Sequence, residues 1–200
     1  MKLLALHGHL QNAKKFKSQT GALAGHLKKI GIQLVYIDGP IVKGEGEDGQ
    51  ILRTWVDDKS ETASFDAIIK AKNENPDAIG IFGFSMGAML ALQLAAHASM
   101  NADSPFSWIK LIVAVSAPFP ADDSPLHNFF PCQCSIPVLF VVGAGDQIAP
   151  PESQMKYFEN FKNSKVFNHE GGHYVPSARK LIQPYLDFFE EFKKNFIVQE

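Results

Sequence analysis

Residues 80–90 read GIFGFSMGAML and contain the pattern G-x-S-x-G at 83–87. An apolar run precedes the pattern and strong helix formers follow it, so the segment predicts a buried strand, a sharp turn and a helix. In such a turn the serine takes a strained backbone position, and flanking glycines remove side chains that would collide. We therefore expect the Ser85 hydroxyl at the carboxyl edge of a sheet, beside a helix N-terminus that favours negative charge.

The pentapeptide alone is a weak signal. Glycine and serine each make up roughly 7% of an average protein, so three fixed positions match by chance about 0.07 times in a chain of this length. A glycine-rich turn with an idle serine is the alternative interpretation. An acid and a histidine at later strand ends would decide between the two.

Size and composition are those of an ordinary globular chain. The 200 residues are 46% hydrophobic and 20% charged, with a formal net charge of -2. That charge does not favour nucleic acid or an acidic membrane, and no apolar run reaches membrane-spanning length. The apolar run before His7 is too short for a signal-peptide core. We therefore expect a single domain over residues 1–200 in the cytoplasm, with the nucleus as a second compartment, and no nucleic-acid or membrane partner.

The two cysteines, Cys132 and Cys134, stand two positions apart. A disulfide between them would be strained, and no further ligand cluster suggests zinc. We expect two free thiols in a reduced compartment, and neither a metal nor an organic cofactor.

Strand-like and helix-like segments alternate along the chain. Most predicted strands are apolar throughout, which is typical of a parallel sheet covered on both faces. The chain therefore predicts an α/β fold with three αβα layers around a mainly parallel, doubly wound sheet. Residues 41–59 are the least regular, 43–49 predict an exposed loop, and Pro184 is expected to kink the last helix. Predicted strands cover 2–6, 32–37, 77–82, 109–115, 136–142 and 165–168, and predicted helices cover 15–30, 60–73, 88–100, 150–161 and 176–196.

An acid and a histidine do follow Ser85 at later strand ends. Asp146 comes after the predicted strand 136–142, and His173 comes after 165–168. Ligands of such sheets sit outside the carboxyl ends of the strands, and the chain order Ser, Asp, His is that of an α/β-hydrolase. A serine hydroxyl needs a base to take its proton, imidazole can do so, and a carboxylate fixes the imidazole tautomer. We expect these three side chains to form a catalytic triad.

Three other residues compete for these roles. His169 is close to His173, but it belongs to the strand end, and only His173 follows the paired glycines that let the backbone turn inward. Asp122 and Asp123 are alternative acids, farther from their strand and in a solvated loop.

The oxyanion of an acyl-transfer reaction needs two donors. The backbone N–H of Met86 is one, and the turn after the first strand supplies the other, from His9 or Leu10. His7 either orients this turn or is a satisfied core histidine. Loop residues on the same edge are candidates for the substrate pocket, although each could equally be ordinary packing: Trp55, Phe119, Ile148 and Val175.

With these residues in place, the chain resembles the FSH family of serine hydrolases, fungal enzymes related to the human ovarian-cancer-associated protein 2. The resemblance implies that Ser85, Asp146 and His173 are nucleophile, acid and base. It also implies hydrolysis of carboxylic esters with short to medium acyl chains. The chain departs from the family at Met86, where glutamine is usual, and in a shorter segment at 41–59. The matching blocks are Leu3–Asn12, Val35–Pro40, Gly83–Ala88, Gly145–Pro150 and Gly171–Pro176.

Other functions stay open at this point. A thioesterase or a polyketide-releasing hydrolase would use the same triad on a different acyl carrier. A non-catalytic binding protein could also share the fold, although such a scaffold would be expected to lose a triad member. The substrate is expected to be a small acyl ester or thioester, and the sequence leaves monomer and homodimer equally open.

Overall fold

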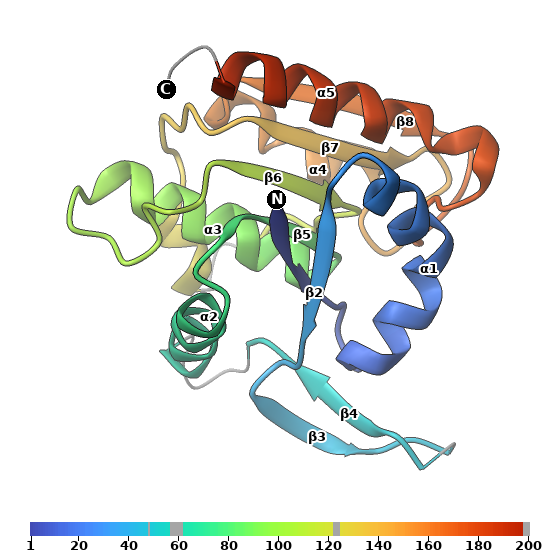
Figure 1. Cartoon of the computed structure of the whole chain (residues 1–200). Helices are drawn as coiled ribbons and strands as arrows, with labels where there is room; N and C mark the ends of the chain where they lie inside the picture. Colours follow the sequence, from blue (N-terminus) through green and yellow to red (C-terminus); the bar gives the residue numbers. More distant parts are fainter. Residues whose placement is uncertain (48, 57–61, 122–124, 198–200) are drawn as a thin grey trace.

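The computed structural model describes residues 1–47, 49–56, 62–121 and 125–197. At its centre lies a six-stranded sheet in which every neighbouring pair is parallel, in the order β2-β1-β5-β6-β7-β8 (Figure 1). The predicted parallel sheet is therefore confirmed. The strands are β1 (Lys2–Leu6), β2 (Gln33–Ile37), β5 (Ala78–Phe84), β6 (Leu111–Val115), β7 (Val138–Gly143) and β8 (Ser164–His169).

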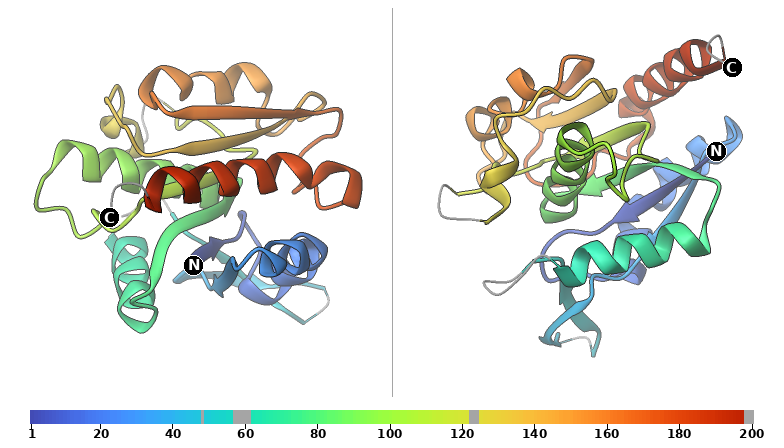
Figure 2. Two further views of the ribbon diagram at one scale, coloured as in Figure 1. Left: turned by 45° about the horizontal axis from the view of Figure 1, so that its top comes forward. Right: turned by 90° about the vertical axis from the view of Figure 1, so that its left-hand side faces the viewer.

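Helices cover both faces of this sheet (Figure 2). Successive strand residues point to opposite faces, so Leu4 and Leu6 of β1 join one apolar core and Leu3 and Ala5 join the other. The first core also contains side chains of α2 and α3, and the second contains those of α1 and α5. These are the three predicted layers. The helices are α1 (Ala13–Lys29), α2 (Thr62–Glu74), α3 (Met86–Met100), α4 (Pro151–Met155) and α5 (Gln183–Ile197).

The sheet is wound in two directions. The chain passes from β1 outward to β2, then returns to β5 on the other side of β1. The strand order therefore reverses between β1 and β5, which is where doubly wound sheets bind ligands. The segments that leave these two strands are the turn after β1 and the turn that contains Ser85.

Residues 41–47 and 49–56, the part of the segment 41–59 that the structure describes, are more regular than predicted. β3 (Ile41–Glu45) and β4 (Ile51–Thr54) form an antiparallel hairpin that stands apart from the main sheet (Figure 1). Its glycine-rich turn is closed by hydrogen bonds from the Gly46 N–H to the Gln50 carbonyl and from the Gly49 N–H to the Gly46 carbonyl. Gly49 has a φ of 71°, which glycine adopts without strain. The polar, glycine-rich composition had indicated an irregular loop, and the structure shows a hairpin turn instead.

Two predicted helices also differ from the structure. The predicted helix 150–161 divides into α4 and a 3-10 turn, η2 (Phe158–Asn160), an arrangement in which Tyr157 and Phe161 both enter the core fully buried. The last helix begins at Gln183, so Pro184 lies in its first turn, where its missing N–H has no helical partner to lose. The predicted kink at Pro184 was therefore wrong. Two further 3-10 turns are η1 (Pro125–Phe129) and η3 (Arg179–Leu181).

The two cysteines are free and buried, as predicted. Burial raises the pKa of the Cys132 thiol to about 11 and also raises the pKa of Cys134. Both thiols therefore stay protonated and unreactive near neutral pH. Across the described ranges, every helix is too short or too polar to span a bilayer.

Candidate active site

The turn between β5 and α3 forces Ser85 into an unusual backbone conformation. Its φ is 52° and its ψ is -121°, a region that residues with a Cβ rarely occupy. A Cβ on Gly87 would lie 2.4 Å from the Leu6 carbonyl oxygen and 2.6 Å from that of His7. A Cβ on Gly83 would lie 2.5 Å from the Ala88 Cα. The glycines of the motif are therefore required by backbone contacts, and they bring the elbow against the end of β1.

Gly87→Ala is expected to destabilise the protein by about 2 kcal/mol, because the new methyl group must displace main chain rather than a flexible side chain. Gly21→Ala in α1 is the matched control, since a Cβ there meets nothing within 4 Å. That variant should gain about 0.5–1 kcal/mol, because alanine favours a helix. Urea denaturation of the two variants and the wild type measures both changes. A Gly87→Ala variant as stable as wild type would contradict the close approach to β1.

Ser85, His173 and Asp146 form one hydrogen-bonded series. The Nε2 of His173 lies 2.9 Å from the Ser85 Oγ, and its Nδ1 lies 2.9 Å and 3.0 Å from the two carboxylate oxygens of Asp146. Because a carboxylate only accepts, Nδ1 carries the proton, and Nε2 is left free to accept from Ser85. This arrangement can move a proton from the serine to the imidazole.

Asp146 is held as a carboxylate by backbone donors. Its Oδ1 accepts hydrogen bonds from the Ala149 N–H at 2.8 Å and the Ile148 N–H at 3.0 Å. Burial alone would raise its pKa, but the Ala149 N–H and the bond to His173 outweigh that effect, so the net pKa lies below the usual value. Asp146 is therefore ionised at neutral pH, although it is only 3% exposed.

Close backbone packing between two loops brings the acid to the histidine. The Gly145 N–H donates to the Gly171 carbonyl at 3.0 Å, and a Cβ on Gly143 would lie 2.6 Å from that same oxygen. His169, the alternative base, is buried at the end of β8, and its Nδ1 accepts from the Gly171 N–H. The structure thus brings His173, and not His169, to Ser85. The alternative acids at positions 122 and 123 lie outside the described residues.

The turn after β1 lies directly beside Ser85. A Cβ on Gly8 would lie 3.3 Å from that of Ser85, and Leu10 has a φ of 53°. The Gly8 N–H donates to the Gln11 Oε1 at 3.1 Å. Met86 is the first residue of α3, where a backbone N–H has no partner within the helix. Gly8 at the start of the turn and Met86 at the start of α3 therefore both lie next to Ser85, and His9 lines the cavity beside it.

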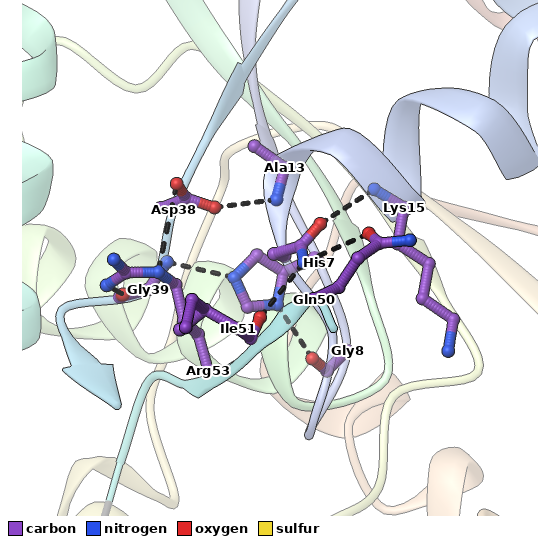
Figure 3. A network of polar contacts seen from close by, with 10 residues as sticks. His7, Gly8, Ala13, Lys15, Asp38, Gly39, Gln50, Ile51 and Arg53 are labelled. Carbon is purple, nitrogen blue, oxygen red and sulfur yellow. Dashed lines mark hydrogen bonds and ion pairs between the residues drawn. The ribbon is translucent and has the colours of Figure 1, made fainter. Parts of the chain in front are cut away.

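His7 orients this turn rather than only filling the core (Figure 3). Its Nε2 accepts from the Gly39 N–H at 2.9 Å, so its Nδ1 carries the proton and donates to the Gly8 carbonyl at 2.7 Å. Burial lowers the pKa of His7, which keeps the ring neutral and this pattern intact. The bond to the Gly8 carbonyl therefore fixes the peptide group between residues 8 and 9, at the start of the turn.

A second set of polar contacts in Figure 3 ties the β3–β4 hairpin to the same region. Arg53 donates to the Gly39 carbonyl at 3.0 Å and pairs with Asp38 at 3.8 Å, and Asp38 accepts from the Ala13 N–H at 2.7 Å. Asn12 caps α1 and also donates to the Ile51 carbonyl. Sequence reasoning missed these residues, although the polar sequence Asp-Gly-Pro at the end of β2 could have indicated Asp38.

A cavity of about 530 Å³ opens beside Ser85. Ile148 and Val175, two of the candidates for the substrate pocket, both line it. Trp55 does not: its side chain is fully buried, and its indole N–H donates to the His7 carbonyl at 2.8 Å. Phe119 lies elsewhere, packed on Tyr157 with ring centroids 4.8 Å apart. For both rings the structure therefore shows ordinary packing, the alternative that the sequence had left open.

Polar side chains that sequence reasoning missed form another part of the cavity wall. They come from the turn after β1, from α1 and from the segment after His173: Gln11, Gln19, Tyr174 and Ser177. Within the described part of the chain, no three His, Cys, Asp or Glu side chains gather as a metal site would require.

The chain is similar in sequence to serine hydrolases and esterases. The model of the family described as Serine hydrolase (FSH1) matches residues 1–185. Esterase OVCA2 from Danio rerio is 28% identical over 225 residues, covering 96% of this chain and 98% of the relative. Esterase AAEL000016 from Aedes aegypti is 27% identical over 219 residues, covering 96% and 76%.

Solved structures are similar in fold. Ferulic acid-bound Est1E from Butyrivibrio proteoclasticus has a TM-score of 0.68 at 18% identity, covering 96% of this chain and 89% of that one. A predicted CIB-like hydrolase from Thermoplasma acidophilum has a TM-score of 0.69 at 17% identity, covering 95% and 86%. These likenesses confirm the predicted α/β-hydrolase fold.

Proposed function

Because the chain belongs to the FSH1 family of serine hydrolases, we propose that it cleaves small carboxylic esters through a covalent acyl-enzyme at Ser85. One observation carries this proposal: the hydrogen-bonded series from the Ser85 hydroxyl through His173 to the Asp146 carboxylate. Each group has the partner that its role requires, in a site that opens to a cavity beside the nucleophile.

The reaction proceeds in two halves. His173 Nε2 takes the hydroxyl proton while Ser85 Oγ attacks the ester carbonyl carbon, and the carbonyl oxygen becomes an oxyanion. When the intermediate collapses, the C–O bond to the alcohol breaks and His173 gives its proton to the departing oxygen. Water then attacks the acyl-enzyme in the same way, which releases the carboxylic acid and restores Ser85.

The oxyanion would be stabilised by two backbone donors. One is the Met86 N–H at the start of α3, where the helix dipole also favours negative charge. The other is the N–H of His9 or of Leu10 in the turn after β1. Hydrogen bonds from such donors become stronger as negative charge develops on the carbonyl oxygen. They therefore lower the activation barrier more than they tighten substrate binding.

The size and the lining of the cavity support the proposal that the substrates are esters with short to medium acyl chains. Its volume of about 530 Å³ suits a small ester, and Phe84, Ile148 and Val175 offer apolar contact. Gln11 and Gln19 face the same space with amide groups, and none of the described residues that line it is an Asp, Glu, Lys or Arg. An uncharged ester therefore fits the site better than an ionised one.

Alkyl fluorophosphonates test this function directly, because Ser85 Oγ can displace fluoride from phosphorus and form a stable adduct. We expect a single modified site at Ser85 by peptide mass spectrometry, and no label on Ser85→Ala. Probes with short and medium alkyl chains should react faster than a long-chain probe. A folded wild-type protein that resists every probe would instead favour a binding role, and equal rates for all chain lengths would contradict the acyl preference.

A further inference from the structure

We propose that Thr54 is a positioning residue that holds the two oxyanion-donating segments at a fixed separation, an inference that rests on the proposed function. Thr54 is the last residue of β4, and it is fully buried although most of the hairpin is exposed. Its Oγ1 lies 2.9 Å from the Nδ1 of His9 and 2.9 Å from the Sδ of Met86. One hydroxyl therefore contacts both segments whose backbone N–H groups would face the oxyanion.

The single proton of the Thr54 hydroxyl limits which of its partners can donate and which can accept. A hydroxyl has a single proton, and the Thr54 Oγ1 also lies 3.4 Å from the Val56 carbonyl oxygen. A Thr54 side chain that donates to the Met86 sulfur or to this carbonyl must therefore accept from His9. His9 then carries its proton on Nδ1. Burial, together with the nearby Lys43 charge, lowers the pKa of His9, so the ring is neutral at neutral pH. In this pattern the His9 Nδ1–H donates to the Thr54 Oγ1, and the Thr54 hydroxyl donates to the Met86 Sδ.

The backbone around Thr54 allows this hydroxyl to act as a rigid support. Thr54 pairs with Ile41 across the hairpin, and a Cβ on Gly39 would lie only 2.6 Å from the Thr54 carbonyl oxygen. The next residue, Trp55, is anchored by its bond to the His7 carbonyl. The main chain is therefore fixed on both sides, and the position of the hydroxyl follows from it.

The turn after β1 needs such a support. His9 and Leu10 are both exposed, so little packing restrains this part of the turn. Of the side-chain contacts of His9, the bond to Thr54 is the one that reaches buried structure. Losing it would leave the bond from His7 to the Gly8 carbonyl to hold this part of the turn, so the His9 and Leu10 backbone N–H groups would be placed less firmly. Because donors at an oxyanion matter most in the transition state, the loss should appear in kcat rather than KM.

Thr54→Val tests this, because valine keeps the shape of threonine and removes the hydroxyl. We expect kcat for p-nitrophenyl acetate to fall about tenfold, with KM changed less than about twofold, and Thr54→Ser to restore kcat. Thr20→Val is the matched control. Thr20 is an equally buried threonine, in α1, and its hydroxyl bonds the Phe16 carbonyl and the Tyr36 hydroxyl. That variant should lose stability but keep kcat.

A double-mutant cycle separates positioning from general destabilisation. His9→Ala removes the other end of the same contact, so its effect on kcat should be much smaller in a Thr54→Val background than in wild type. Fully additive effects, or a Thr54→Val enzyme with wild-type kcat, would overturn the role of Thr54 while leaving the esterase intact. A wild-type protein without ester hydrolysis would overturn the proposed function itself, and the role of Thr54 with it.

Discussion

His173→Gln is expected to lower kcat for ester hydrolysis by roughly 10⁴-fold or more, with KM little changed. The imidazole Nε2 lies 2.9 Å from the Ser85 hydroxyl and is the group that must take its proton. A glutamine amide can occupy similar space and form hydrogen bonds, but it does not accept a proton near neutral pH. Initial rates with p-nitrophenyl acetate measure the loss, and a thermal melt establishes that the variant is folded.

His169→Gln is the control for this experiment, because His169 lies four residues earlier at the end of β8. It is 4% exposed, and burial lowers its pKa. Since its ring faces the Gly171 N–H rather than Ser85, its replacement should reduce stability more than activity. If His169→Gln abolished turnover and His173→Gln did not, the base would be assigned to the wrong histidine.

The three residues of the proposed triad could be chosen from sequence because the signals that mark them are local. Buried parallel strands read as continuous apolar runs, so their carboxyl ends can be marked without knowing how the strands pair. Ser85, Asp146 and His173 each stand shortly after such a run, and glycines mark the turns. Parallel packing then brings strand ends together, and the structure has all three side chains within hydrogen-bonding distance.

The supporting contacts could not be found in the same way, because they join residues that are distant in the chain. Thr54 contacts His9 across 45 positions, and Trp55 contacts His7 across 48. No local pattern of polarity distinguishes a buried threonine at the end of a hairpin from an exposed one. The sequence therefore left Trp55 open between the substrate pocket and ordinary packing, although its indole has its partner in the core.

The site has two parts, and different kinds of contact hold the residues of each part in place. Asp146 and His173 are held by loops whose backbones hydrogen-bond one another directly, through Gly145 and Gly171. The turn after β1 instead depends on side-chain contacts with the segment after β2 and with the hairpin, made by His7, Asp38 and Arg53. A change in the hairpin should therefore affect oxyanion stabilisation and leave the proton-transfer groups in place.

Asp146→Asn is expected to lower kcat by about 10⁴-fold while the protein stays folded. Oδ1 of Asp146 accepts the Ile148 and Ala149 N–H groups, and Oδ2 lies 2.9 Å from the His173 Nδ1. In the variant the amide oxygen must stay with the two backbone donors. The amide NH₂ then faces Nδ1, which has to become an acceptor, so the imidazole proton moves to Nε2 and points at Ser85. A ring in that tautomer cannot take the serine proton.

Steady-state kinetics at neutral pH measure this loss, and Asp187→Asn on the exposed face of α5 is the matched control. The folded pKa of Asp146 is lowered, so its ionised form adds stability at neutral pH that is lost as the pH falls through that folded pKa. Denaturation curves of wild type and Asp146→Asn should therefore converge in acid, whereas the kinetic difference persists wherever the wild type is active. An Asp146→Asn variant with near-wild-type kcat would show that another group fixes the imidazole tautomer.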